Sequence, residues 1–186
     1  MDEKKHPPLR IFWGQVTEKN VNQLEILHTT IFPVKYNAAF YKEVVHAPEG
    51  FVQLAYYNEL LVGSVCCRKE RYVASHAPGN DKAASSTTDS STSPKKSSLY
   101  IMTLGVLAPY RERGIGHQLI THVLSLVESS PLCKDVVDIY IHVQEGNEDA
   151  LRFYTRYGFQ ITEKIEGYYK RIEPTSCFIV RKKIER

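Results

Sequence analysis

YIMTLGVLAPYRERGIG, residues 100–116, is the stretch that decides the fold of this 186-residue chain. It begins as an apolar run typical of a buried strand and ends in an Arg-x-x-Gly-x-Gly turn from Arg111 to Gly116. Apolar side chains then recur at helical spacing, at Ile115, Leu119, Ile120, Val123, Leu124 and Val127. This spacing predicts an amphipathic helix over 114–129 that packs on the sheet containing the strand.

The N-terminus of this helix has the properties of an anion-binding site. The first N–H groups of a helix lack intrahelical acceptors and form the positive end of its dipole. Gly114 and Gly116 have no Cβ that would keep a pyrophosphate away, and Arg111 and Arg113 supply cationic donors. A lone Gly-x-Gly serves equally well as a tight strand-to-helix turn, so the turn alone leaves both interpretations open.

Two common nucleotide-binding patterns do not fit this turn. A Rossmann Gly-x-Gly-x-x-Gly would need a third glycine where Leu119 stands. A Walker loop would need Gly-Lys followed by Ser or Thr, which is absent from the turn. Neither a dinucleotide site nor a P-loop is therefore predicted.

The composition indicates one globular domain. Apolar residues make up 42% of the chain and charged residues 24%, a balance typical of a folded domain of this length. The 24 Lys and Arg exceed the 21 Asp and Glu by only three, too few for a dedicated nucleic-acid binder. The N-terminal residues lack the apolar core of a signal peptide, and no apolar run reaches the roughly 18 residues of a membrane span. We therefore expect a soluble, intracellular protein.

The four cysteines, Cys66, Cys67, Cys133 and Cys177, show neither Cys-x-x-Cys spacing nor a paired framework. We expect reduced thiols packed in strands, with no structural disulfide and no metal site.

The chain as a whole reads as alternating strands and helices of one mixed α/β domain over 9–183. Strands are predicted near 9–16, 51–57, 60–73, 98–107, 136–143, 159–166 and 176–183, and helices near 18–30, 37–47, 114–129 and 147–157. Residues 74–97 are rich in Ser and Thr and contain no Ile, Leu, Val, Phe or Tyr. This composition predicts a disordered insertion within a hairpin and not a domain boundary.

The strand, the RERGIG turn and the helix together resemble the CoA-pyrophosphate motif of the Gcn5-related N-acetyltransferase (GNAT) superfamily. A second segment, NEDALRFY at 147–154 followed by YGF at 157–159, resembles the later CoA motif of that superfamily. The resemblance implies the GNAT fold, an α/β (α+β) domain with a mixed central sheet of about seven strands and about four flanking helices. It also implies acetyl-CoA as co-substrate and no metal.

Further strings resemble the N-alpha-acetyltransferase 50 family, the catalytic subunits of the NatE activity: IFPVKYN at 31–37, LAYYN at 54–58, YIMTLGVLAPYR at 100–111, IHVQ at 141–144 and YYKRIEP at 168–174. The resemblance implies acetyl transfer from acetyl-CoA to the free α-amino group of proteins, with a preference for an initiator Met followed by an apolar residue. Lysine side chains are a further acceptor that it leaves open. It also implies protein N-termini and the NatA complex near ribosomes as partners, no nucleic-acid or membrane partner, and a cytoplasmic and nuclear location.

Positions of the site residues also follow from this resemblance. It implies a catalytic pair, Tyr100 and His142. It implies a peptide-binding group, Phe32, Pro33, Val34, Tyr36, Met102, Tyr168, Tyr169, Lys170, Arg171 and Ile172. It implies a CoA-binding group, Leu104, Gly105, Val106, Arg111, Glu112, Arg113, Gly114, Ile115, Gly116, His117, Asn147, Ala150, Phe153, Tyr154 and Arg156.

These residues suggest a direct transfer. An α-ammonium has an ordinary pKa near 8, so a modest base suffices, and a histidine such as His142, near 6.5, suits that role better than a tyrosine such as Tyr100, near 10. The amine then attacks the thioester itself, so no cysteine is needed as nucleophile. The resemblance further implies that backbone N–H groups of 104–106 polarise the thioester carbonyl and that Tyr154 protonates the departing thiolate.

Two other functions are compatible with these patterns. One is a catalytically weak, acetyl-CoA-binding scaffold subunit of a larger N-terminal acetyltransferase. The other is an enzyme of the same class that acts on lysine side chains, polyamines or another small amine. The two adjacent tyrosines at 168–169 favour an extended peptide over a long lysine stem.

Overall fold

The structure is a computed structural model that describes residues 9–73 and 96–185. Its helices are α1 (Val21–Ile31), α2 (Ala38–Val45), α3 (Ile115–Ser129) and α4 (Glu148–Thr155). Its strands are β1 (Phe12–Gly14), β2 (Val52–Tyr57), β3 (Leu60–Arg71), β4 (Ser97–Val106), β5 (Val136–Gln144), β6 (Gln160–Ile165) and β7 (Cys177–Lys183). Each strand and helix expected from the sequence is confirmed, and two 3-10 helices, Ala108–Tyr110 and Pro131–Cys133, were not expected.

The strands follow the order β1-β2-β3-β4-β5-β7-β6 in a seven-stranded sheet. β4 runs parallel to β5, from the pair Ser97 and Val136 to the pair Tyr100 and Tyr140. β7 lies between β5 and β6 and is antiparallel to both. The sheet is therefore mixed, as the predicted fold class requires.

The described residues divide into two compact units. One is drawn from Met1–Arg68 and Ile101–Cys133, and the other from Lys69–Tyr100 and Lys134–Arg186.

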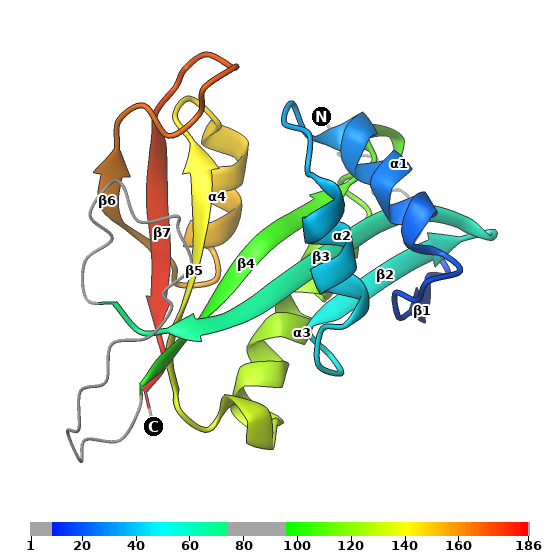
Figure 1. Cartoon of the computed structure of the whole chain (residues 1–186), viewed down its shortest axis with the longest axis horizontal. Coiled ribbons are helices and arrows are strands. Elements are labelled where there is room, and N and C mark those ends of the chain that lie inside the picture. Colours follow the sequence, from blue (N-terminus) through cyan, green and yellow to red (C-terminus); the bar gives the residue numbers. More distant parts are fainter. Residues whose placement is uncertain (1–8, 74–95, 186) are drawn as a thin grey trace, which may run out of the picture. The chain divides into compact units, whose positions relative to one another are not determined.

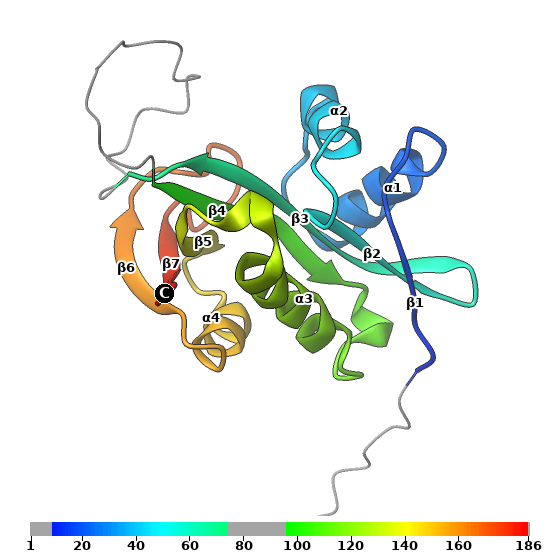
Figure 2. The same cartoon turned by 90° about the horizontal axis from the view of Figure 1, so that it is seen from below.

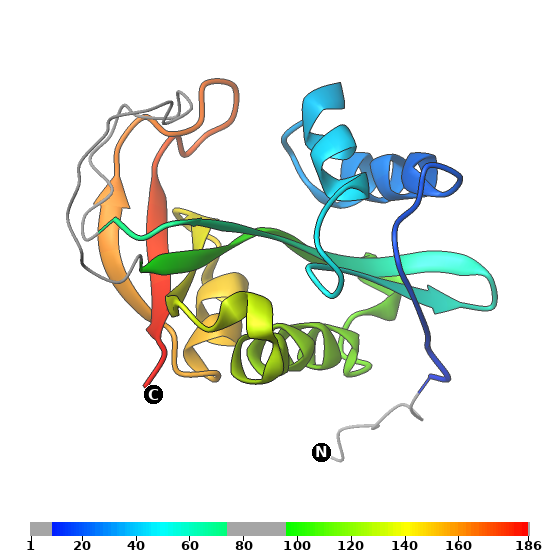
Figure 3. The ribbon, with the colours of Figure 1, turned by 60° about the horizontal axis from the view of Figure 1, so that its bottom comes forward.

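The first unit is layered. α1 and α2 cover one face of β2 and β3, and α3 covers the opposite face (Figure 2, Figure 3). The core beneath α1 and α2 consists of Leu24, Leu27, Tyr41, Val44, Val52, Leu54, Leu61 and Cys66. The predicted apolar stripe of α3 is buried at Ile115, Leu119, Ile120, Val123 and Val127, while Leu124 lies at its margin. Burial of this stripe fixes the position of the turn that precedes the helix.

The second unit contains β5, β7 and β6 side by side, with α4 beside β5 (Figure 1). Its buried cluster is Tyr140, Ile165, Cys177 and Ile179, and Tyr100, Tyr168 and Tyr169 pack against it. Because side chains alternate along a strand, Asp138, Tyr140 and His142 of β5 lie on one face of the sheet.

The residues at the two ends of the predicted insertion are hydrogen-bonded to each other, as expected for an insertion in a hairpin. The N–H of Tyr72 donates to the carbonyl of Lys96 over 3.0 Å. The predicted end at residue 97 was wrong, because Ser97 belongs to β4. Its N–H donates to the Asp135 carbonyl over 2.9 Å, and its hydroxyl donates to the Asp135 carboxylate over 2.6 Å. The rest of the segment, residues 74–95, lies outside the described residues.

All four cysteines are buried, as the sequence predicted, but Cys133 lies in the 3-10 helix Pro131–Cys133 and not in a strand, so that part of the prediction was wrong. Burial raises the pKa of Cys66 to about 12 and raises that of Cys67 as well. Across residues 9–73 and 96–185, no helix is long and apolar enough to cross a membrane. The same residues contain no cluster of His, Cys, Asp and Glu side chains able to hold a metal ion.

Candidate functional site

Tyr100 and His142, the predicted catalytic pair, are in direct contact in the second unit. The hydroxyl of Tyr100 lies 3.0 Å from Nδ1 of His142, within hydrogen-bond distance. The rings meet edge to face, with centroids 5.3 Å apart. The pair arises because β4 and β5 are parallel neighbours that bring Tyr100 opposite Tyr140, two residues before His142 on the same face.

Tyr168, from the loop between β6 and β7, completes this cluster. Its ring stacks on His142 with centroids 4.7 Å apart, and its hydroxyl lies 3.5 Å from Nδ1. Tyr169 packs edge-on against Tyr168, and burial raises the pKa of Tyr169, so its phenol remains neutral. Nδ1 of His142 is thus surrounded by phenols, an arrangement able to hold and pass a proton. The remaining residues of this loop in the predicted peptide group are Lys170 and Arg171, both exposed, and Ile172, half-buried.

The predicted phosphate-binding turn lies in the first unit, between β4 and α3. Gly114 is the N-cap of α3 with a φ of 80°, and no side chain caps the helix there. Glu112 also has a positive φ, 60°. Arg111 donates from Nε to the carbonyl of Val106 over 3.0 Å and so ties the turn to the end of β4. The turn presents an uncapped helix N-terminus beside Arg111 and Arg113, which is the chemistry that a pyrophosphate requires.

Gly114, at this turn, is not crowded by other residues. A Cβ built on Gly114 meets no heavy atom of another residue closer than 4.0 Å, so its surroundings are open. The helix buries Ile115, while Gly116 is half-buried and His117 is exposed. At the end of β4, Val106 is buried and Leu104 and Gly105 are half-buried.

The second predicted CoA segment lies in the second unit, on α4. Asn147 caps this helix by accepting from the N–H of Ala150 over 3.1 Å, a structural role that the sequence interpretation did not include. Tyr154 is only 3% exposed and packs between Phe153 and Phe159. Arg156 is exposed at the end of the helix. Asn147 therefore fixes the start of α4 in addition to any contact with a ligand.

The residues of the first unit that belong to the predicted peptide-binding group include an aromatic pair, Phe32 and Tyr36, which we call the aromatic group. The rings of Phe32 and Tyr36 meet edge to face with centroids 6.0 Å apart. Of the predicted residues that lie between them in the sequence, Val34 is half-buried and Pro33 is exposed. Met102 and Tyr36 both pack against the core of the unit. These side chains offer an apolar surface and no charge, which suits a methionine side chain.

His28 lies behind this aromatic group, and sequence reasoning missed it. Its side chain is fully buried, with ring centroids 5.4 Å from Phe32 and 5.5 Å from Tyr36. Nε2 lies 3.3 Å from the hydroxyl of Ser64 and 3.4 Å from that of Thr103. Burial lowers the pKa of His28 to about 4, so the ring is neutral. Its position among the apolar residues on the buried side of α1 was the sequence feature that could have indicated a buried histidine.

Gly105 is close to the same aromatic group. A Cβ at this position would lie 2.4 Å from Cδ1 of Ile31 and 2.9 Å from Cζ of Phe32. Both distances are shorter than van der Waals contact, so both side chains would have to move. The absence of a side chain at Gly105 therefore sets the position of Phe32.

We expect Gly105→Ala to lower the free energy of unfolding by about 1–3 kcal/mol through overpacking. Because the substitution displaces Phe32, the KM for peptide should rise several-fold. Gly114→Ala is the matched comparison: it meets open space but strains a positive φ by about 1–2 kcal/mol. It should raise the KM for acetyl-CoA instead. Initial rates with each substrate varied in turn, together with urea denaturation, measure both. Identical effects of the two substitutions on the two KM values would contradict these assignments.

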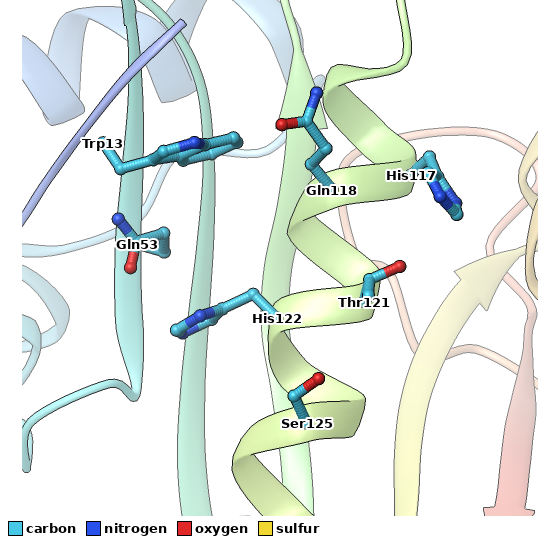
Figure 4. Close-up of a pocket in the computed structure, with 7 residues that line it drawn as sticks. All are labelled: Trp13, Gln53, His117, Gln118, Thr121, His122 and Ser125. Atoms are coloured by element: carbon cyan, nitrogen blue, oxygen red, sulfur yellow. The ribbon is translucent and has the colours of Figure 1, made fainter.

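A cavity of about 370 Å³ lies beside α3 in the first unit (Figure 4). Trp13 and Gln53 line it from β1 and β2, and the remaining residues come from α3: His117, Gln118, Thr121, His122 and Ser125. Figure 4 shows His117 pointing away from Trp13, whereas His122 extends toward the strands, where Nε2 lies 2.7 Å from the carbonyl of Gly50. No Lys or Arg lines this cavity, so it does not offer the charge that a pyrophosphate needs.

Comparison with known proteins places this geometry in context. The model of the acetyltransferase (GNAT) family matches residues 19–159. N-alpha-acetyltransferase 50 of Danio rerio is 42% identical over 175 residues, which cover 94% of this chain and 89% of that protein.

Two solved structures share the fold. Arabidopsis thaliana Naa50 in complex with the bisubstrate analogue CoA-Ac-MVNAL is 41% identical, with a TM-score of 0.73 over 92% of this chain and 97% of the other. Arabidopsis thaliana NAA60 in complex with acetyl-CoA is 26% identical, with a TM-score of 0.72 over 94% of this chain and 100% of the other.

Proposed function

The chain belongs to the N-alpha-acetyltransferase 50 family of GNAT acetyltransferases, and from this premise we propose that it acts on proteins that begin with Met followed by an apolar residue. It is an N-terminal acetyltransferase that takes its acetyl group from acetyl-CoA. The proposal adds the substrate preference and the roles of individual side chains.

The contact between Tyr100 and His142 carries the chemical part of this proposal. The two polar atoms lie 3.0 Å apart, so a proton leaving the α-ammonium at the Tyr100 hydroxyl, or at a water held by it, is within reach of Nδ1. Nδ1 accepts when Nε2 carries the ring proton. Tyr168, stacked on the ring, restrains its orientation. His142 is then the proton acceptor, and Tyr100 orients and relays the proton.

The turn at 111–116 is proposed to hold the diphosphate of acetyl-CoA. When bound, acetyl-CoA supplies an activated acetyl thioester. The N-terminal backbone of α3, with Gly114 at its N-cap, provides N–H donors, and Arg111 and Arg113 balance the charge. Backbone N–H groups of 104–106 are assigned to the thioester carbonyl, and Tyr154 to protonation of the departing thiolate.

A direct transfer fits the state of the buried thiols. Burial raises the pKa of Cys66 to about 12, and it raises the pKa of Cys67 well above its ordinary value. Only the thiolate is a competent nucleophile, so these two thiols are inert at neutral pH. Cys133 and Cys177 are buried as well, and we propose that the amine attacks the acetyl group without an acetyl-cysteine intermediate.

The apolar surface formed by Phe32, Val34, Tyr36 and Met102 supports the preference for methionine. A charged first residue would lose its hydration there without gaining a partner. The analogue bound by Arabidopsis thaliana Naa50 has the peptide sequence MVNAL, which starts with Met followed by an apolar residue.

We extend the proposal to the cellular setting. From the motif resemblance to the N-alpha-acetyltransferase 50 family we propose association with the NatA complex as part of the NatE activity, near ribosomes and with cytoplasmic and nuclear pools. Co-purification of the full chain with NatA subunits tests the association, and recovery of the enzyme only apart from them would contradict it.

A peptide library that varies the first two residues tests the substrate preference. We expect kcat/KM for Met-Leu peptides to exceed that for Ser- or Asp-starting peptides by about 10–100-fold, because one apolar contact contributes about 1–3 kcal/mol. Mass spectrometry after incubation with acetyl-CoA measures the products. Met-Leu peptides with a blocked α-amino group and an internal lysine are the control. Equal kcat/KM values across first residues, or equal acetylation of the blocked peptides, would contradict the proposal.

A further inference from the structure

Tyr140 lies directly behind the catalytic pair and has no role in the function described so far. It is the Cα partner of Tyr100 across the parallel strands β4 and β5. The two rings stack with centroids 4.8 Å apart and an interplanar angle of 18°. The ring of Tyr140 also meets His142 edge to face, with centroids 5.8 Å apart. One side chain thus contacts both members of the pair.

Charged groups on β3 and β7 hold Tyr140 at its hydroxyl and over its ring. Its hydroxyl donates to the carboxylate of Glu70 on β3. The guanidinium carbon of Arg181, its register partner on β7, lies 5.1 Å from the ring centroid. Hydrogen bonds to a carboxylate and cation–π contacts both restrain a ring in one orientation.

Arg181 is itself fixed. It forms an ion pair with Asp138, and the two side chains are only 10% and 3% exposed. Asp138 lies on β5, two residues before Tyr140 and on the same face of the sheet. One row of side chains therefore links Asp138 and Arg181 through Tyr140 to Tyr100.

Tyr140 is only 2% exposed and its hydroxyl donates to Glu70, so we assign it no direct contact with the peptide or acetyl-CoA and expect it to act through its neighbours. Its stacking on Tyr100 and its edge-on contact with His142 restrain where the two rings lie, and the positions of these rings set the distance between the Tyr100 hydroxyl and Nδ1 of His142. Misplacement of a catalytic group by about 1 Å costs up to 100-fold in rate.

We propose that Tyr140 is a positioning residue for acetyl transfer, held by Glu70 and Arg181, and that it maintains the contact between Tyr100 and His142. The inference rests on the proposed roles of Tyr100 and His142. Glu70 acts as the acceptor that keeps the Tyr140 ring in place, so its ability to accept a hydrogen bond matters more than its charge.

Four variants of the full chain test this proposal with a Met-Leu peptide and acetyl-CoA. Tyr140→Phe and Glu70→Leu each remove the hydroxyl–carboxylate bond, and we expect each to lower kcat by roughly tenfold with both KM values within about twofold of wild type. Glu70→Gln retains an acceptor and should restore kcat to within about threefold. The double variant Tyr140→Phe/Glu70→Leu should be no slower than either single variant, because both remove the same bond.

Lys69→Gln is the matched control. Lys69 precedes Glu70 on β3 and pairs with Asp135, away from Tyr140, so its loss should leave kcat unchanged. Thermal denaturation and acetyl-CoA affinity are measured for every variant. If Tyr140→Phe fails to fold, the comparison of Glu70→Leu with Glu70→Gln decides the question. An unchanged kcat in Glu70→Leu, or equal losses in Glu70→Gln and Glu70→Leu, would overturn the proposal. A wild-type chain that is inactive on the Met-Leu peptide would instead overturn the proposed substrate. This result is distinguishable, because the variants are judged only against an active wild type.

Discussion

Replacement of His142 by alanine is expected to lower kcat for acetylation of a Met-Leu peptide by about 10²–10⁴-fold, the contribution of a positioned general base. The reason is local, because Nδ1 of His142 is the acceptor next to the Tyr100 hydroxyl. The KM for acetyl-CoA should stay within a few-fold, since the turn that is assigned to its diphosphate lies at 111–116. Peptide-dependent release of the CoA thiol, followed with a chromogenic disulfide, measures the rate.

The pH dependence of this variant gives a second check. A base is needed only while the α-amino group is protonated, and its ordinary pKa is near 8. The rate of His142→Ala should therefore rise about tenfold per pH unit below 8, and its defect should shrink above pH 9. A defect that stays constant with pH would assign His142 a structural role.

His46→Ala is the control for the loss of a histidine, because His46 is exposed at the end of α2 and contacts the Lys42 carbonyl. A kcat within threefold of wild type in His142→Ala would contradict the assignment of the proton acceptor. Absence of peptide-dependent thiol release in the wild-type chain would favour the scaffold alternative.

The fold was predictable to the level of its elements because each element carries its own periodicity. The stripe of α3, read from Ile115 to Val127, is buried as expected. The first and last residues of the strands were less predictable, because contacts with other strands and loops decide where a strand begins and ends. β1 pairs with β2 only from Phe12 to Gly14, although apolar residues suggested a strand over 9–16. Similarly, Ser97 joins β4 through Asp135, 38 residues further along the chain.

The arrangement of the candidate site was predictable where a motif is continuous in sequence and not where residues are brought together across strands. The segments at 100–116 and 141–144 contain Tyr100, the turn and His142, and motif resemblance identified them. Alternation in DIYIHV also places Tyr140 on the face of His142. Its partners Glu70 and Arg181 come from β3 and β7, and only the strand order brings them together. The environment of His28 was missed for the same reason, since this residue lies on α1 whereas its partners Ser64 and Thr103 belong to β3 and β4.

Acidification is expected to destabilise the protein through His28. Burial lowers the folded-state pKa of this residue to about 4, whereas the unfolded chain has the ordinary value near 6.5. The unfolded state therefore binds more protons than the native state below pH 6.5, so stability falls as pH drops through this window and is independent of His28 above it. The difference of roughly 2.5 pKa units corresponds to about 3 kcal/mol, most of which should be lost by pH 4.5.

The variant His28→Gln isolates this contribution. Gln places a neutral amide near the position of Nε2, next to Ser64 and Thr103, and does not titrate. It should be less stable than wild type at pH 7, because the packing of the imidazole against Phe32 and Tyr36 is lost, but it should lose less stability on acidification.

Urea denaturation of wild type and His28→Gln at pH 7 and 4.5 gives the four free energies of unfolding. His46→Gln, at an exposed position, should follow wild type at both pH values. The carboxylates of Asp135 and Glu166, whose pKa values are lowered by their hydrogen bonds, add a loss at still lower pH that all three proteins share. Parallel pH dependence in wild type and His28→Gln would show that His28 does not govern acid stability, and that the aromatic group around it tolerates a charge.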